Sequence, residues 1–153
     1  MGWAEPLRGG CYCGALRFEI RSVFDCLWCH CGDCRKTTGA PATVSVVVRS
    51  DDFAVVAGMP VSHPRPHGAQ RFCGQCGGGW HYAWTASMGD LTSIGVGALD
   101  DPEAVRPRAH QFDAHRVEWL GLTMGCPGFQ TASSRIPIVV PDRSPLHAAG
   151  RRT

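Results

Sequence analysis

The sequence predicts a mostly β domain with short helical turns, and three observations favour this fold class. Short runs in which apolar and polar residues alternate, or in which β-branched residues gather, are separated by turn residues. The chain supplies 19 glycines and 11 prolines for those turns. No long amphipathic helical pattern is present, so nothing can serve as the crossover helix of a βαβ unit.

Each expected element rests on a local pattern. In residues 15–20, Leu16, Phe18 and Ile20 alternate with polar side chains, and residues 43–48 are rich in β-branched side chains that suit a strand buried on both faces. Turn residues separate the expected elements from one another. The expected strands are residues 15–20, 43–48, 53–57, 70–73, 91–96 and 136–140, and short helical turns are expected at residues 33–38 and 101–105.

Length and charge narrow the functional classes. A chain of 153 residues fits one domain, expected over residues 1–140, with a tail at 141–153 that has no apolar pattern and should fray. The formal net charge of +2 gives no reason to expect a nucleic acid or an anionic membrane as partner. No run is long enough to span a bilayer, and the first residues lack the features of a secretory signal, so we expect a cytoplasmic protein.

Nine cysteines are the most informative feature of the composition. An odd number cannot pair completely, and stable disulfides are rare in the cytosol, so metal binding is the better interpretation. Cys126 stands alone and is more consistent with a core position. The other eight fall in three clusters: Cys11 and Cys13; Cys26, Cys29, Cys31 and Cys34; Cys73 and Cys76.

The first and third clusters predict one closed metal site. Residues two apart in an extended segment point to the same side, so Cys11 and Cys13 can act as a pair. The C-x-x-C turn of Cys73 and Cys76 offers two more thiolates, and tetrahedral zinc accepts four. A closed four-cysteine site is typical of structural zinc.

The second cluster predicts a different kind of site. Cys29, Cys31 and Cys34 can hold one metal and leave a position open, as reactive zinc sites do, while alternation points His30 away from that metal. Two alternatives remain for Cys26: it completes this site as a fourth ligand, or it is a small buried residue. Arg35 and its neighbour Lys36 are either a solvated basic pair or cations that offset thiolate charge and bind a carboxylate.

Ordered motifs run along most of the chain. They are Gly9-Gly10-Cys11-Tyr12-Cys13-Gly14, Cys29-His30-Cys31-Gly32-Asp33-Cys34-Arg35-Lys36 with Gly39-Ala40-Pro41, Arg71-Phe72-Cys73-Gly74-Gln75-Cys76-Gly77, Gly97-Ala98-Leu99-Asp100-Asp101-Pro102, Trp119-Leu120 and Pro127-Gly128-Phe129. Together these motifs resemble the glutathione-dependent formaldehyde-activating enzyme family, whose domain is of the centromere protein V type.

The resemblance implies a Mss4-like antiparallel β fold and two Zn²⁺ ions. One is structural, on the first and third clusters, and one is catalytic, on Cys29, Cys31 and Cys34. The implied activity is that of a carbon–sulfur lyase that condenses glutathione, as co-substrate, with formaldehyde or another small aldehyde.

Three functions follow as hypotheses. In an enzyme, Arg35 and Lys36 would bind a carboxylate of the thiol, and His30 would shuttle a proton near it. In a non-catalytic interaction module, both zinc sites would be closed, with Cys26 completing the second. A thiol redox protein is the weakest hypothesis, because the thioredoxin-like βαβ context is missing.

Overall fold

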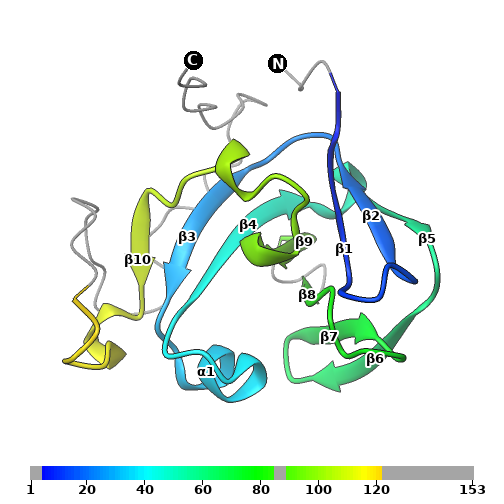
Figure 1. The fold of residues 1–153 in the computed structure, drawn as a ribbon. Coiled ribbons are helices and arrows are strands. Elements are labelled where there is room, and N and C mark those ends of the chain that lie inside the picture. Colours follow the sequence, from blue (N-terminus) through cyan, green and yellow to red (C-terminus); the bar gives the residue numbers. More distant parts are fainter. Residues whose placement is uncertain (1–4, 85–88, 122–153) are drawn as a thin grey trace.

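The computed structural model describes residues 5–84 and 89–121, and this part of the chain is built from two β-sheets. The small sheet contains β1 (Leu7–Gly10), β2 (Arg17–Ile20) and β5 (Phe53–Ala57), in the order β1-β2-β5 with antiparallel neighbours. In Figure 1 it lies beside the large sheet, and β5 leads the chain from one sheet to the other.

The large sheet has seven strands in the order β10-β3-β4-β9-β8-β7-β6. Every neighbouring pair is antiparallel except β10 and β3, which run parallel. The strands are β3 (Asp25–Cys29), β4 (Thr43–Arg49), β6 (Pro60–Arg65), β7 (Gly68–Cys73), β8 (His81–Trp84), β9 (Leu91–Gly95) and β10 (Ala109–Gln111).

Helical structure in the described part is limited to short pieces. The α-helix α1 (Gly32–Thr38) follows β3, and 3-10 turns occur at Ser50–Asp52, Val96–Ala98, Pro102–Ala104 and Asp113–His115. None of the helices among the described residues has the length and apolar character needed to cross a membrane. The prediction of a mostly β fold with short helical turns is therefore confirmed.

Most expected elements are present, with shifted ends. The expectation for residues 53–57 matches β5, and those for 15–20, 43–48, 70–73 and 91–96 correspond to β2, β4, β7 and β9. The expected turns at 33–38 and 101–105 correspond to α1 and to Pro102–Ala104. The strands β1, β3, β6, β8 and β10 were not predicted. The strand expected at 136–140, the domain boundary at 140 and the tail at 141–153 lie outside the described residues.

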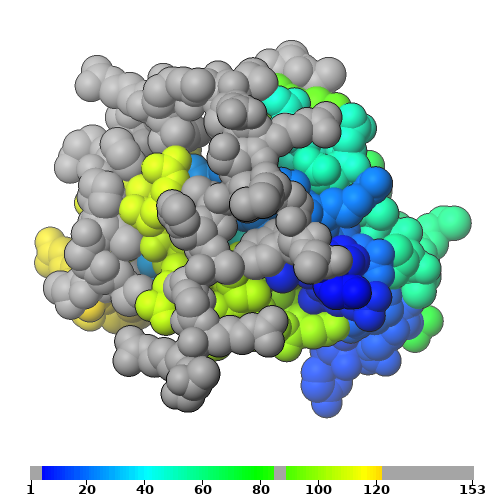
Figure 2. All heavy atoms as spheres, turned by 90° about the horizontal axis from the view of Figure 1, so that it is seen from above, coloured from blue at the N-terminus to red at the C-terminus, as the bar shows by residue number. Residues whose placement is uncertain are grey.

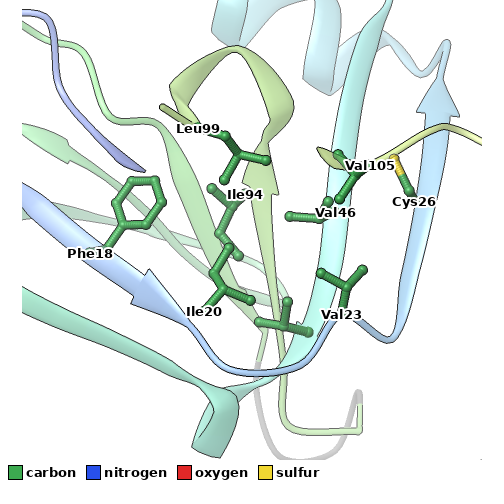
Figure 3. Close-up of a cluster of buried hydrophobic side chains, with 9 residues drawn as sticks. Phe18, Ile20, Val23, Cys26, Val46, Ile94, Leu99 and Val105 are labelled. Carbon is green, nitrogen blue, oxygen red and sulfur yellow. The ribbon is translucent and has the colours of Figure 1, made fainter. Parts of the chain in front are cut away.

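The main core lies between the small sheet and the central strands of the large sheet (Figure 3). The alternation of β2 buries Phe18 and Ile20 completely, and β4 and β9 contribute side chains that are equally buried. This buried surface is the main source of stability for the fold. Its members are Phe18, Ile20, Val23, Cys26, Val46, Val48, Ile94, Leu99 and Val105.

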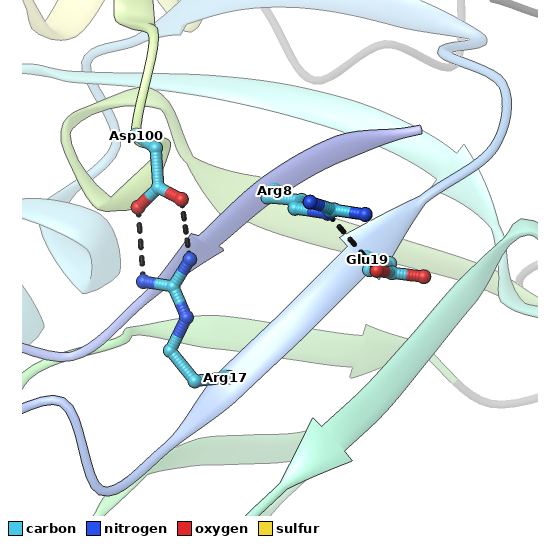
Figure 4. Close-up of polar contacts among 4 residues, drawn as sticks. All are labelled: Arg8, Arg17, Glu19 and Asp100. Atoms are coloured by element: carbon cyan, nitrogen blue, oxygen red, sulfur yellow. Dashed lines mark hydrogen bonds and ion pairs between the residues drawn. The ribbon is translucent and has the colours of Figure 1, made fainter. Parts of the chain in front are cut away.

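The segment after β9 ties the two sheets together. Leu99 forms an isolated antiparallel bridge with Gly9, and the backbone N–H of Asp100 donates to the carbonyl oxygen of Arg8 at 2.9 Å. The side chain of Asp100 accepts two hydrogen bonds from the guanidinium of Arg17 on β2, and Arg8 pairs with Glu19 beside it (Figure 4). In Figure 2 this yellow-green segment lies against the dark-blue N-terminal strand.

Candidate metal centres

The first cysteine cluster lies where a turn of the small sheet meets a turn of the large sheet. Cys11 and Cys13 follow β1, Cys73 ends β7, and Cys76 lies in the turn before β8. The four sulfur atoms lie within 4.8 Å of one another, at 3.5 Å for Cys11–Cys13 and 3.8 Å for Cys13–Cys73. Zn–S bonds of about 2.3 Å place tetrahedral ligands about 3.8 Å apart. The cluster that the sequence predicted therefore fits a four-cysteine zinc site.

Backbone groups around this cluster stabilise thiolates. The N–H of Leu16 donates to the sulfur of Cys11 at 3.2 Å. Desolvation opposes ionisation of Cys11, but this N–H and hydrogen bonds from the other cysteines outweigh it and lower its pKa to about 6. Gly77 has a φ of +73°, and its N–H donates to the carbonyl oxygen of Cys73 at 2.8 Å. Glycine adopts this left-handed turn conformation without strain.

The second cluster lies at the end of β3 and the start of α1. Cys29 is the last residue of β3, Cys31 is the N-cap of α1, and Cys34 lies in the first turn. The sulfur of Cys31 accepts a hydrogen bond from the N–H of Cys34 at 3.2 Å. Gly39, with a φ of +73°, ends the helix, and its N–H donates to the carbonyl oxygen of Arg35 at 2.8 Å.

The three cysteines are all partly exposed, and their sulfur atoms lie within 4.8 Å of one another. Across residues 5–84 and 89–121, no fourth Cys, His, Asp or Glu donor belongs to this group. The fold thus brings together the three ligands that the sequence predicted for the second site.

The pKa of each thiol in this cluster depends on the other two. A hydrogen bond with Cys29 is the main cause that lowers the pKa of Cys31, which reaches about 2, and the pKa of Cys29 is raised by its bonds to Cys31 and Cys34 and by burial. For Cys34, the bond to Cys29 lowers the pKa, but the bond to Cys31 and burial raise it to about 11. Three sulfurs this close hold only one negative charge among them unless a cation offsets their repulsion. A bound metal ion would be such a cation, and its thiol ligands must be deprotonated.

The structure separates Cys26 from this cluster. Cys26 lies on β3 opposite Val46, is 1 % exposed and packs in the main core near Val105 (Figure 3). Side chains three apart on a strand point to opposite faces, so Cys26 and Cys29 diverge. Of the two alternatives left open by the sequence, the small buried residue fits this position.

His30 lies between two of these cysteines in the chain but faces a different environment. Its side chain is fully buried, and its Nε2 lies 3.0 Å from Nδ1 of His110 on β10. Burial is the main cause that lowers the pKa of both imidazoles. His30 is not part of the group of three sulfurs, in agreement with the alternation argument. Nothing in the sequence pattern had indicated His110.

An open groove of about 570 Å³ runs along α1, and none of the three cysteines of the second cluster is among its lining residues. Arg35 and Lys36 line it, and the Nε atom of Arg35 is buried without a hydrogen-bond partner in the described part of the chain. Trp119, which is 74 % exposed, forms part of the same groove, although sequence reasoning had not assigned it a role there. The lining residues are Gly32, Arg35, Lys36, Gly39, Ala40, Pro41, Val117 and Trp119.

Comparison with known proteins identifies the family. A sequence model described as glutathione-dependent formaldehyde-activating enzyme matches residues 6–115 of this chain. No curated protein matches it significantly. The match covers most of the chain, which therefore belongs to the glutathione-dependent formaldehyde-activating enzyme family, and the mostly β fold is of the Mss4-like kind found in that family.

Proposed function

We propose that this member of the family catalyses the reversible addition of a thiol to a small aldehyde at the Cys29–Cys31–Cys34 site. Glutathione is the proposed thiol and formaldehyde the proposed aldehyde, because the family takes its name from them. In the forward direction, the thiol sulfur forms a bond to the carbonyl carbon, and the carbonyl oxygen takes up the proton that the thiol has lost. The reverse reaction breaks the same carbon–sulfur bond, so the activity is that of a carbon–sulfur lyase.

The observation that carries this proposal is the incomplete ligand set. Three partly exposed cysteines converge with no fourth donor among the described residues, and a groove that includes Arg35 and Lys36 runs along the same helix, α1. Reactive zinc sites keep a position for substrate, whereas structural sites have four protein ligands. Cys29, Cys31 and Cys34 would hold a zinc ion with one position open, and the ion would supply the positive charge that lowers the pKa of a thiol substrate.

The cations of the groove are the proposed anchors for the thiol. Zinc with three thiolates is a net anion, so the positive charges of Arg35 and Lys36 make the groove more favourable for an anionic substrate. Glutathione carries carboxylates, and the guanidinium of Arg35 offers paired N–H donors that match a carboxylate. The exposed ring of Trp119 gives the same groove an apolar wall. These contacts would hold the thiol sulfur near the aldehyde carbon.

The first cluster is proposed to hold a structural zinc ion. Its four cysteines supply a complete tetrahedral set, and two of them, Cys11 and Cys73, are buried. The sites therefore divide the work: the first stabilises the fold and the second binds the reacting thiol.

Exchange NMR on the zinc-loaded protein with glutathione and formaldehyde tests the activity directly. The protein should accelerate formation and breakdown of the hydroxymethyl thioether, and no acceleration across several aldehydes would refute the proposal. Cobalt substitution separates an open site from the alternative of a closed interaction module. The absorption of the second site should change when glutathione is added, whereas a closed site would keep its spectrum.

The Arg35→Gln substitution tests the proposed anchor. Loss of a charge-assisted hydrogen bond, worth about 1.5–3 kcal/mol, should raise the KM for glutathione at least about 10-fold. The rate with 2-mercaptoethanol, which has no carboxylate, should stay near that of the wild type. Arg106→Gln is the matched control, because Arg106 is exposed and does not line the groove. An equal effect on both thiols would exclude carboxylate binding by Arg35.

A further inference from the structure

A third group of metal-ligating side chains lies outside both cysteine clusters. His30, His110 and Asp113 each offer a donor atom, and these atoms lie within 4.8 Å of one another. Both imidazoles are almost completely buried, at 0 % and 1 % exposure, while Asp113 is partly exposed. The function proposed above makes no use of His110 or Asp113.

The parallel pairing of β10 with β3 creates this group. His110 lies opposite Trp28 in the register, and the backbone N–H of His30 donates to the carbonyl oxygen of Gln111 at 3.1 Å. The rings of His30 and His110 are therefore stacked, with centroids 5.2 Å apart. Phe112 then adopts a left-handed conformation, with a φ of +53°, and turns the chain so that Asp113 lies beside the two rings.

The spacing of the donor atoms suits a metal ion. Nε2 of His30 and Nδ1 of His110 are 3.0 Å apart, and tetrahedral zinc with Zn–N bonds of about 2.0–2.1 Å places two imidazole nitrogens about 3.3 Å apart. Only a small movement of either ring is needed. The second nitrogen of His30, Nδ1, is buried without a hydrogen-bond partner in the described part of the chain, so it is a further candidate donor atom of that ring.

The carboxylate supplies the third ligand. Arg116 contacts Oδ1 of Asp113 through Nε, at 2.7 Å, and through Nη2, and this ion pair fixes the carboxylate beside the two rings. Two imidazoles and one carboxylate form a donor set of intermediate softness that suits zinc and similar divalent transition metals. The positive charge of Arg116 lies next to the site and should weaken binding of a dication.

We propose that His30, His110 and Asp113 form a third metal site, which binds a divalent transition metal ion such as Zn²⁺ independently of the two cysteine clusters. The site is distinct from the reactive one because the imidazole of His30 turns away from the three sulfurs toward β10. Neither its occupancy nor its test depends on the activity proposed above.

Equilibrium dialysis of the full chain against buffered free Zn²⁺, followed by metal analysis, tests the site. The wild type should bind a third equivalent of zinc beyond the two expected for the cysteine clusters. Asp113→Asn should weaken that third equivalent at least about 10-fold. Arg116→Gln should strengthen it about threefold, since it removes the neighbouring positive charge. Asp113→Asn is the primary variant, because Asp113 is partly exposed and its replacement spares the core.

Glu118→Gln is the matched control, since Glu118 is exposed, carries the same charge and is not in the group. It should leave the third equivalent unchanged. Cobalt titration gives a second readout: a nitrogen and oxygen site adds weak visible bands without further thiolate charge-transfer absorption. A wild type that binds only two equivalents at saturation would overturn the proposal and leave His30 and His110 as a hydrogen-bonded pair. A third equivalent that survives Asp113→Asn with unchanged affinity would overturn it as well.

Discussion

Replacing Cys26 tests the division between core and metal site most directly. The sequence places this cysteine three residues before Cys29, where a fourth thiolate would be expected in a closed site. The structure instead buries it in the main core, opposite Val46. We therefore expect Cys26→Ala and Cys26→Ser to lower the stability of the fold and to leave the zinc content unchanged.

The expected loss follows from what surrounds the sulfur. Cys26→Ala removes one buried heavy atom and leaves a small cavity among aliphatic side chains, which costs about 1–2 kcal/mol. Cys26→Ser replaces the sulfur by a smaller and more polar oxygen within the main core, which costs about 1–3 kcal/mol. With a urea m-value of about 2 kcal/mol/M, within the range for small proteins, these losses should lower the unfolding midpoint by about 0.5–1.5 M.

Urea denaturation followed by tryptophan fluorescence measures this shift. Free zinc must be buffered at one concentration for all variants, because bound zinc adds to the stability of the folded state. Zinc content is measured on the same samples, with Cys31→Ala as the variant that should lose one equivalent. If Cys26→Ala also loses one equivalent, Cys26 is a ligand and the second site is closed, which would refute both the assignment and the open-site mechanism.

Three further predictions follow from the structure. Cys73→Ser should give insoluble protein, whereas Cys31→Ser should stay folded. The reason is that a structural zinc contributes on the order of 10 kcal/mol to a domain whose stability is about 5–15 kcal/mol. Similar solubility of the two variants would contradict this prediction. Gly9→Ala should cost about 1–3 kcal/mol in urea unfolding, since its Cβ would lie 2.3 Å from a backbone oxygen, while Gly97→Ala, with open space around it, should cost much less. Burial lowers the pKa of His81 in the folded chain below the ordinary value of 6.5. Below pH 6.5 the imidazole of His81 is therefore protonated more fully in the unfolded chain than in the folded chain. Stability should therefore fall as the pH drops below that value, and less steeply in His81→Gln; equal slopes in urea midpoints would exclude this cause.

The sequence predicted those strands whose local pattern is strong. β4 consists largely of β-branched residues, and β2 alternates between buried and partly exposed positions. β6 escaped prediction because Pro60 and Pro64 disfavour a strand interior, and the structure accommodates them at the edge of the large sheet. β10 is three residues long, and its place beside β3 depends on a parallel pairing over a long stretch of chain.

The candidate metal ligands divide in the same way. Cys29, Cys31 and Cys34 are close in the chain, so their spacing alone indicated a shared site, and C-x-C and C-x-x-C turns indicated the four-cysteine cluster. His110 is separated from His30 by 80 residues and meets it only through the register between β10 and β3. No local spacing encodes such a pair.

The position of each cysteine cluster in the fold explains why the two should differ in their effect on stability. Cys13 and Cys73 are 60 residues apart, and their cluster fastens a turn of the small sheet to a turn of the large sheet. A link that closes a long loop removes more freedom from the unfolded chain than a link within a few residues. The second cluster spans only residues 29–34 and fixes the start of α1 to the end of β3. Loss of a metal there would therefore free only a local segment, which suits the proposed reactive site, whereas loss of a metal from the first cluster would loosen the link between the two sheets.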